Sequence, residues 1–528
     1  MKIKNYGLIT GFIALILVLA GCSSGNTESN GIGESTESNE NPTSNEIIEE
    51  VNYPLTMAVP TMDPHLALNT QVQVTSHIFE TLFAQNENFE AVPLLLESYE
   101  VSEDGKTYTF KLRQGVKFHN GKEMTAEDVA ASLNRWKSVV ARAQQALGDS
   151  EFVIQDDYTV TITLAQPSND LPLQLSHRLN SAVIMPKEIA ENAPVTGVTE
   201  YIGTGPYKFV EWKADQYIHL QRYEEYAAVE EPQSGMAGKK TPKYNNVYFR
   251  INTDSATSFS SFLSGDYAYT DVNIDNLPQV ENLNGVTVDK KIYGDFNVVF
   301  NKKSPLFSNL KYRQAVAAAI NAEEILLGVT SDPELIVQNS SYVFKENTTY
   351  HTEADTDYYN QNDPEKAKQL LKEAGYNGEV VRLLTSKDQN GIFYNATIVL
   401  ADQLEAIGMK VQIDVYDFAT LVSKRGEEDS WDIYVGYFAV PAGPTQLLYI
   451  YPNYGFAEDP QLAEYIKALS SAQGEEELKA ANETLQQYLW DTLNTVKIGD
   501  IYGYYAVRED LKDAIFYNNG IVLPALDK

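Results

Sequence analysis

The chain has a single cysteine, six histidines and few basic side chains among its 528 residues. One cysteine forms no internal disulfide and no zinc cluster. Lys and Arg together number 40 against 73 Asp and Glu, so the formal net charge is −33 at pH 7. Because so acidic a surface repels phosphate backbones, we expect no nucleic-acid partner.

The usual sequence signatures of catalysis are also missing. The chain contains no HExxH, no CxxC and no GxSxG, which removes the common motifs of zinc proteases, thiol redox enzymes and hydrolases. Segment 115–122 (GVKFHNGK) is one residue too long for a phosphate-binding loop, and Glu123 stands where Ser or Thr would bind magnesium. No two histidines are four residues apart. The sequence therefore indicates a binding protein rather than an enzyme, with no cofactor and no metal site.

Composition and length indicate a globular protein with several cores. Hydrophobic residues make up 43% and charged residues 21% of the chain, which is ordinary for soluble domains. A chain of 528 residues is too long for one core, so we expect two or three domains. The 34 tyrosines combine an apolar face with a polar tip and suit recognition surfaces.

The N-terminus reads as an export signal. Lys2 and Lys4 precede a mostly apolar run at 8–20, which is too short to span a bilayer comfortably and fits the core of a secretory signal. The run ends in Leu-Ala-Gly-Cys22, which resembles the bacterial lipobox. That resemblance implies a lipoprotein signal peptide at 1–21 and a diacylglycerol on Cys22. The alternative is an ordinary signal peptide with an incidental cysteine.

A low-complexity segment follows the signal. Residues 23–50 hold six Ser, five Asn and seven Glu but no aromatic or basic residue. Such a segment cannot bury enough apolar surface to offset its ordering entropy. We therefore predict a disordered tether at 22–50 and a globular part that begins near Val51.

The globular part shows alternating strand and helix patterns. Apolar spacing predicts a helix over 70–85, and alternation around an Asp-Gly turn predicts a hairpin over 99–112. Thr125 is the expected N-cap of a helix. A second helix is predicted over 363–374, with Asp363 and the following proline at its start and Gly375 just after its end. Strands and helices alternate in the second half, which favours an α/β fold.

Several motifs resemble the bacterial extracellular solute-binding proteins of family 5, which serve peptide and nickel ABC importers. The most specific lies in 94–136, with the R-x-G-V-x-F-H-x-G turn followed by T-A-E-D-V. The resemblance covers essentially the whole globular chain. The other matching stretches are Met62-Asp63-Pro64, 78–82 (IFETL), 203–207 (GTGPY), 262–266 (FLSGD), 301–321, 363–376 and 404–409.

This resemblance implies an α/β fold of the two-lobed periplasmic-binding-protein type, class II in its large three-domain variant. A hinge between the lobes would lie at two chain crossings near 292 and 500. The implied division gives domain I as 51–89 with 201–291 and 500–528, domain II as an insertion at 90–200, and domain III as 292–499.

The resemblance also indicates where a ligand binds. The family uses the segment after its x-D-P turn, the start of domain III and the loop after a late strand. In this chain the matching positions are Asn69 and Thr70, then Tyr293, Phe296 and Asn297, then Tyr437, Phe438 and Val440.

One position departs from the peptide-binding branch of the family. That branch has an aspartate four residues after the glycine of the late strand, where it pairs with the peptide's α-ammonium. Gly436 plus four is Val440, and the loop 439–445 (AVPAGPT) is uncharged. We therefore expect weak binding of simple free-amine peptides at this point, unless another acid such as Asp417 or Asp432 substitutes.

The resemblance implies an extracytoplasmic lipoprotein, anchored to the bacterial cell membrane, that captures a peptide or peptide-like solute as a monomer and delivers it to an ABC permease. Two alternatives stay open. One is a receptor for a nickel or other metal chelate, an opine or another non-peptide solute. The other is an extracellular chaperone or signal receptor that keeps the fold without import.

Overall fold

The computed structural model describes the chain from residue 48 to residue 527 with short gaps. The residues left out are 57–58, 68–70, 195, 354–356, 389–390, 440, 453, 512–513 and 518–520. The predicted signal peptide, Cys22 and nearly all of the predicted tether lie outside the described residues.

The first core packs around a four-stranded sheet in the order β1-β11-β9-β8. β1 starts at Ile48, three residues before the predicted start of the globular part. It pairs in parallel with β11, and the pairing begins with Ile48 opposite Tyr244. A three-stranded sheet, β10-β20-β19, lies beside α1. The elements are β1 (Ile48–Leu55), α1 (Gln71–Ile78), α5 (Lys187–Glu191), β8 (Tyr207–Lys213), β9 (Tyr217–Arg222), β10 (Thr241–Pro242), β11 (Tyr244–Ile251), β19 (Ala514–Tyr517) and β20 (Ile521–Asp527).

The second core lies under an antiparallel sheet in the order β4-β5-β7-β6. The predicted hairpin is confirmed as β4 and β5. The predicted helix start is confirmed too, because Thr125 and Asp128 form a capping box at the start of α2. The elements are β2 (Phe83–Gln85), β3 (Ala91–Pro93), β4 (Leu96–Val101), β5 (Thr107–Leu112), α2 (Ala126–Val139), α3 (Ala141–Leu147), β6 (Phe152–Asp156), β7 (Thr159–Thr163) and α4 (Leu171–Leu175).

The third core surrounds the largest sheet, in the order β12-β18-β13-β17-β15-β16, with β14 beside β18. Asp363 caps α10 and Gly375 ends it in the left-handed conformation, as predicted. The strands are β12 (Tyr269–Val272), β13 (Val286–Phe300), β14 (Ile336–Val337), β15 (Val380–Ser386), β16 (Lys410–Tyr416), β17 (Ile433–Phe438) and β18 (Thr495–Arg508). The helices are α6 (Ser255–Ser264), α7 (Leu277–Val280), α8 (Leu310–Ala319), α9 (Ala322–Thr330), α10 (Pro364–Ala374), α11 (Ile392–Ala406), α12 (Phe418–Arg425), α13 (Pro460–Ser471) and α14 (Gly474–Thr492).

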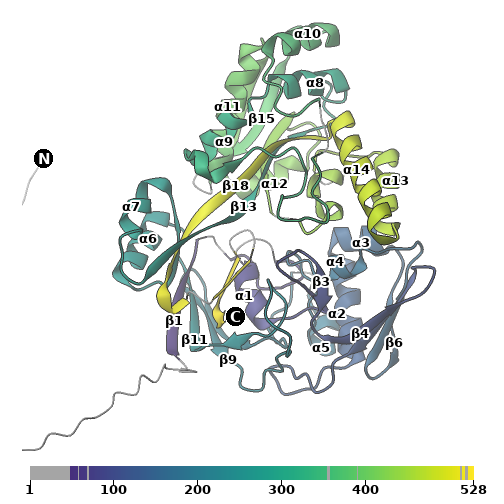
Figure 1. Ribbon diagram of the computed structural model, residues 1–528, viewed down its shortest axis with the longest axis vertical. Coiled ribbons are helices and arrows are strands. Elements are labelled where there is room, and N and C mark those ends of the chain that lie inside the picture. The colour runs from purple at the N-terminus through teal and green to yellow at the C-terminus, as the bar shows by residue number, and fades with distance from the viewer. Residues whose placement is uncertain are drawn as a thin grey trace, which may run out of the picture. The chain divides into compact units, whose positions relative to one another are not determined.

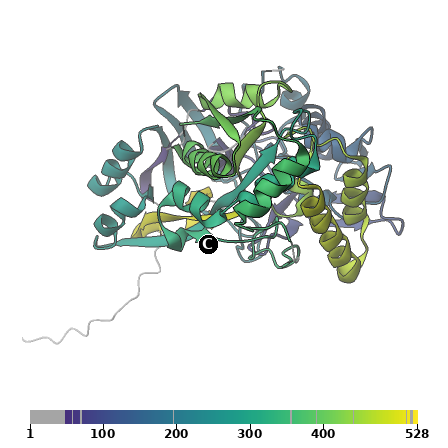
Figure 2. The same cartoon turned by 90° about the horizontal axis from the view of Figure 1, so that it is seen from above.

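The long antiparallel strands β13 and β18 connect the first core to the third (Figure 1). Tyr505 on β18 belongs to the first core and Val496 on the same strand belongs to the third. The register shifts between Ile292 and Gly294 and again between Phe296 and Asn297. α9 packs on β18. Figure 2 shows the same molecule from above, with the C-terminal part of the chain in yellow. The predicted hinge crossings fall in this irregular stretch, and the hinge and the three-domain division stay predictions.

The helix predicted over 70–85 is wrong in its second half, because α1 ends at Ile78. In a continuing helix the Ile78 carbonyl would accept from residue 82, but it accepts from the Gly205 N–H at 2.9 Å. A Cβ on Gly203 would lie 2.1 Å from the same carbonyl oxygen. The segment 203–205 therefore docks on the end of α1 and turns the chain away, which leads Glu80 and Gln85 toward a buried polar region.

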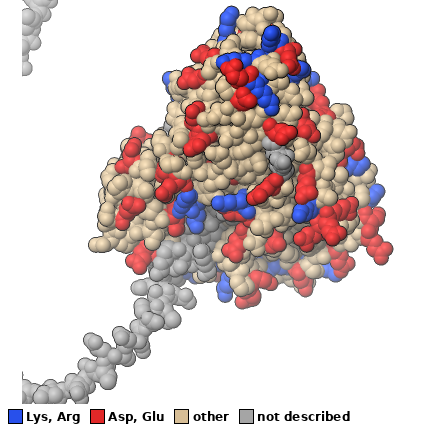
Figure 3. All heavy atoms as spheres, turned by 45° about the horizontal axis from the view of Figure 1, so that its top comes forward, with Lys and Arg blue, Asp and Glu red and all other residues tan. Residues whose placement is uncertain are grey.

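The charge excess is spread over the surface. On the face drawn in Figure 3, acidic side chains form scattered patches on a surface that is mostly uncharged, and fewer basic side chains lie among them. This distribution is that of a solvated surface, which fits the composition.

Candidate ligand-binding site

The second and third cores meet where α4 contacts the loop after β17. Thr445 Oγ1 donates to Asp170 Oδ1 at 2.9 Å, and Gln174 Nε2 donates to Asp170 Oδ2 at 2.7 Å. Gln446 Nε2 donates to the Leu173 carbonyl at 3.2 Å. Burial raises the pKa of Asp170 to about 6, even though both of its hydrogen bonds lower it. The contact is thus a buried polar clasp with a carboxyl at its centre.

Two further contacts join the same parts of the chain. The side-chain amide of Asn169 donates to the Ala472 carbonyl at 2.7 Å, at the end of α13. An apolar cluster packs Phe89 and Leu173 against Phe344 and Ala442. In the described residues the two parts are therefore held together over a continuous buried surface.

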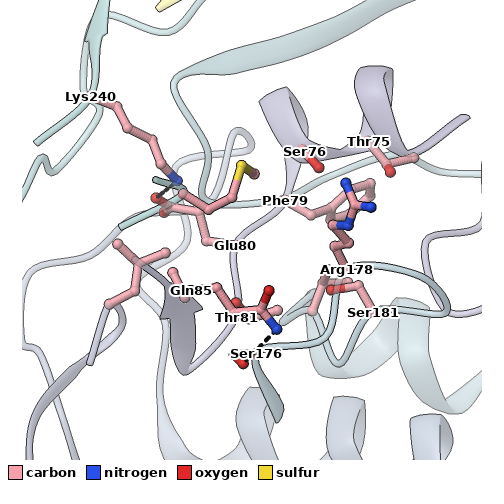
Figure 4. Close-up of a pocket in the computed structure, with 14 residues that line it drawn as sticks. Thr75, Ser76, Phe79, Glu80, Thr81, Gln85, Ser176, Arg178, Ser181 and Lys240 are labelled. Carbon is pink, nitrogen blue, oxygen red and sulfur yellow. Dashed lines mark hydrogen bonds and ion pairs between the residues drawn. The ribbon is translucent and has the colours of Figure 1, made fainter. Parts of the chain in front are cut away.

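A small cavity lies between the end of α1, the segment 176–183 and the segment 236–240 (Figure 4). Its open space is about 40 Å³, enough for a few water molecules. Nine of its 14 lining residues have polar side chains: Thr75, Ser76, Glu80, Thr81, Gln85, Ser176, Arg178, Ser181 and Lys240. Water molecules held there would find hydrogen-bonding groups in the wall.

One ion pair in the cavity wall is fully occupied by protein partners. Glu80 and Lys240 are 3.5 Å apart and both are buried. Glu80 also accepts from the Tyr226 hydroxyl at 2.8 Å and from Thr204 Oγ1 at 3.0 Å. This pair therefore supports the wall of the cavity.

Arg178 brings positive charge to the same cavity. It is only 9% exposed, and Figure 4 shows its guanidinium between Ser181 and Thr75 of α1. Burial raises the pKa of the Tyr437 hydroxyl, and the nearby Arg178 guanidinium opposes that increase. The charge of Arg178 therefore acts on the end of β17 as well as on the cavity.

Tyr293 and Tyr437 form an aromatic pair at the end of β17. Their ring centroids are 5.0 Å apart, and the Tyr437 hydroxyl donates to the Tyr293 carbonyl at 2.8 Å. A Cβ on Gly294 would lie 2.0 Å from the Tyr437 ring and 2.5 Å from the Phe438 carbonyl. Glycine at 294 is thus what allows Tyr437 to lie across β13. Both tyrosines are half-buried.

Asn297 belongs to a buried charged cluster on β13 and β18. Its Nδ2 donates to Asp295 Oδ2 at 2.5 Å. Lys497 Nζ lies 3.3 Å from the same carboxylate and 2.7 Å from Asp500 Oδ1. Asn339 Nδ2 donates to Asp500 Oδ2 at 2.7 Å.

The other predicted site residues divide into two groups. Phe296 is fully buried in the third core, and Phe438 is 6% exposed with its ring edge-on to Tyr449 at 4.9 Å. Asn69, Thr70 and Val440 lie outside the described residues. The structure thus brings Tyr293 and Tyr437 together and places Asn297 in the charged cluster, while Phe296 and Phe438 occupy packing positions.

Neither acid suggested as a substitute at the late strand faces this region. Asp417 caps α12 and accepts from Thr420, and its carboxyl is exposed. Asp432 accepts from Ser304 at 2.6 Å and from the Arg382 N–H at 2.8 Å within the third core. The residues that sequence reasoning missed are Asp170, Arg178, Asp295, Lys497 and Asp500. For the last two, the only signal was a charge inside the otherwise apolar run 496–501.

In the described part of the chain no three His, Cys, Asp or Glu side chains gather as they would around a metal ion. Among the same residues, none of the helices combines the length and apolar character needed to cross a bilayer.

Comparisons with known proteins agree with each other. Residues 90–458 match the model of the bacterial extracellular solute-binding proteins, family 5. A probable peptide ABC transporter periplasmic-binding protein of Sinorhizobium fredii is 32% identical over 68% of this chain and 69% of its own length. Among solved structures, AgaA from A. tumefaciens R10 in complex with agropinic acid is 25% identical, with a TM-score of 0.76 over 89% of this chain and 95% of that one. The periplasmic binding protein DppA from Helicobacter pylori, in complex with the peptide STSA, is 21% identical with a TM-score of 0.77 over 92% and 98%.

Proposed function

This chain belongs to the bacterial extracellular solute-binding proteins of family 5, and we propose that it captures a peptide or peptide-like solute and delivers it to the permease of an ABC importer. Its fold is that of the periplasmic binding proteins of this family. The relative in Sinorhizobium fredii and the Helicobacter pylori structure support a peptide as the solute class.

The main support for the proposal is a set of buried polar groups close to where the cores meet. The long strands β13 and β18 connect the first core to the third beside these groups. The cavity beside Arg178, the Tyr293–Tyr437 pair and the cluster around Asn297 all adjoin the surface where the second and third cores meet. A solute enclosed there would exchange its water shell for fixed hydrogen-bonding groups, and the surrounding apolar contacts would exclude solvent.

We assign the solute contacts to Tyr293, Tyr437, Asn297 and Arg178. Tyrosine rings offer apolar area with a polar edge, and guanidinium groups pair with carboxylates such as the C-terminus of a peptide. Asn69, Thr70 and Val440 stay predicted contacts. The burial of Phe296 and Phe438 supports a packing role for both.

We propose hinge closure at the register shifts of β13 and β18. A hinge concentrates a large backbone change in a few residues, and β-bulges interrupt the regular ladder at that point. The clasp at Asp170 and Thr445 would form on closure and break on opening.

We further propose that the protein is a monomeric lipoprotein held at the outer face of the cell membrane by lipid on Cys22. The lipobox-like end of the signal segment and the following tether support this. The protein binds its solute and does not convert it.

A non-peptide solute is the second candidate. It is favoured by the AgaA complex, whose ligand is agropinic acid, and by the uncharged loop 439–445.

Native mass spectrometry of the protein purified from its host tests the proposal. We expect a mass excess equal to one small molecule, which is released on denaturation and identified by fragmentation. A peptide supports the main proposal and an opine or a metal chelate supports the second. Protein that carries no solute, and that binds none from a library of peptides, opines and metal chelates, would contradict both.

A further inference from the structure

The charged cluster on β13 and β18 has more negative than positive charge. Asp295 and Asp500 are directly opposite each other in the antiparallel ladder, an arrangement that is normally destabilising because like charges face across the strands. Lys497 is the cation within ion-pair distance, so two carboxylates and one ammonium give a net charge of −1. All three side chains are at most 2% exposed.

The cluster also has more acceptors than donors. Among the described residues, Asp295 Oδ1 and Asn297 Oδ1 are buried and have no hydrogen-bond partner. The Tyr449 hydroxyl is buried and has none either. The side chains of Asp295 and Asn297 project from the same face of β13, because they are two residues apart and their other polar atoms are hydrogen bonded. Buried polar atoms left unpaired in this way are costly, so each calls for an explanation.

Burial raises the pKa of both carboxyl groups, that of Asp500 to about 6. Burial also raises the pKa of the Tyr449 hydroxyl, with further contributions from the nearby Asp295 and Asp500. Phe438 is opposite Asp295 in the ladder, and the Tyr449 ring centre lies 4.9 Å from that of Phe438, which places Tyr449 near this end of the cluster. The cluster is thus short of one positive charge and of several N–H donors.

The position of the cluster connects it to the proposed solute site. Lys497 Nζ lies 5.3 Å from the centre of the Phe344 ring, and Phe344 packs against Phe89 and Leu173 where the cores meet. On the other side, Asp295 and Arg178 both act on the Tyr437 hydroxyl. The cluster therefore lies one side chain behind the meeting surface and within electrostatic reach of the cavity residue Arg178.

We propose that Asp295, Asn297 and Tyr449 form a subsite for the primary ammonium group of the bound solute. An ammonium group carries one positive charge and three N–H donors, which matches the three unpaired oxygens and the missing charge. A water molecule would satisfy some of the acceptors but would leave the charge unbalanced. A metal ion is disfavoured because, among the described residues, the acids here are not part of a group of three metal-ligating side chains.

This subsite rests on the proposed peptide-binding function and makes it more specific. It assigns amine recognition to β13, while the loop 439–445 has no charge with which to hold an amine. The solute would then be a free-amine peptide or another primary amine. Arg178 would supply the opposite charge for a carboxylate.

The test uses a library of random tetrapeptides in free and N-acetylated forms, retained on the full-length protein and quantified by mass spectrometry. The variant is Asp295→Asn, which keeps the shape and removes the charge. The matched control is Asp432→Asn, a buried acid of the third core whose oxygens are occupied by Ser304 and Arg382.

We expect wild-type protein to retain free-amine peptides at least tenfold better than their acetylated forms. Asp295→Asn should bind both forms alike, and Asp432→Asn should keep the preference. Equal retention by wild type, or an unchanged preference in Asp295→Asn, would overturn the subsite and leave the proposed function intact. Retention of neither form would contradict the peptide function and the subsite with it.

If Asp295→Asn does not fold, a crystal structure of wild type with a retained peptide decides the question. The peptide ammonium should lie within hydrogen-bond distance of Asp295 Oδ1. An ammonium held by any other acid would overturn the assignment.

Discussion

We expect the clasp between α4 and the loop after β17 to make the proposed closure sensitive to pH. Asp170 has a pKa of about 6 where it is buried, against an ordinary 3.8. Asp170 as a whole is 8% exposed, so solvent screens the effect little. The shift of two units corresponds to about 3 kcal/mol between the two protonation states. Arg142 is the cation that opposes the shift, and Tyr108, Tyr350 and Tyr451 are other titratable groups near Asp170.

Because the pKa of Asp170 is raised in the closed form, closure should become weaker as pH rises. A carboxyl whose pKa is higher in the closed form favours closure fully below pH 3.8, and this contribution is lost as pH rises through about 6. Between pH 5 and pH 7 closure should weaken by about 1.3 kcal/mol, which is roughly tenfold in the closing equilibrium. Asp170→Asn should remove most of that pH dependence, because the amide cannot ionise.

Single-molecule energy transfer measures the closing equilibrium directly. Labels on cysteines introduced at Glu103 and Glu475, in protein with Cys22→Ser, would report the distance between the β4–β5 hairpin and the start of α14 without solute. A closed fraction in wild type that does not change between pH 5 and pH 7, or one that changes equally in Asp170→Asn, would refute the reasoning. Either result would mean that this carboxyl stays solvated.

Three further outcomes are expected. Gly294→Ala should lower the free energy of unfolding by about 1–3 kcal/mol and weaken solute binding, because the new Cβ would lie 2.0 Å from the Tyr437 ring. Urea unfolding and binding calorimetry that are both unchanged would show that the ring moves aside without cost. Lys497→Met should cost about 3–5 kcal/mol in urea unfolding, since two buried carboxylates lose their ammonium, and a loss below 1 kcal/mol would contradict their burial as charged groups. Cys22→Ala should release folded protein from the membrane fraction, whereas processed protein that stays with the membrane would rule out lipid on this residue.

Turn and capping patterns in the sequence predicted those strands and helix ends that depend on residues close together in the chain. The hairpin around 99–112 and the ends of α10 depend on a turn and on caps, and both are visible in the residue order. The end of α1 depends on Gly203 and Gly205, which are about 125 residues away in the chain. Apolar spacing alone therefore continued the helix too far.

In the candidate site, too, some features could be predicted from the sequence, and others depend on residues that are far apart in the chain. Resemblance to the family pointed to Tyr293 and Tyr437, which do form a pair. It also pointed to Phe296 and Phe438, whose burial depends on which face of each strand is covered by distant segments. Asp295 and Asp500 are far apart in sequence and meet only through the register of β13 and β18, so no local pattern could associate them.

The central claim is that the protein closes around a peptide-like solute at its strand hinge. Small-angle X-ray scattering of the protein freed of solute, and again after saturation with the solute recovered from its host, tests this most directly. The account predicts a smaller radius of gyration for the saturated protein, together with a higher melting temperature from binding to the folded state. A saturating solute that raises the melting temperature but leaves the scattering curve unchanged would contradict hinge closure.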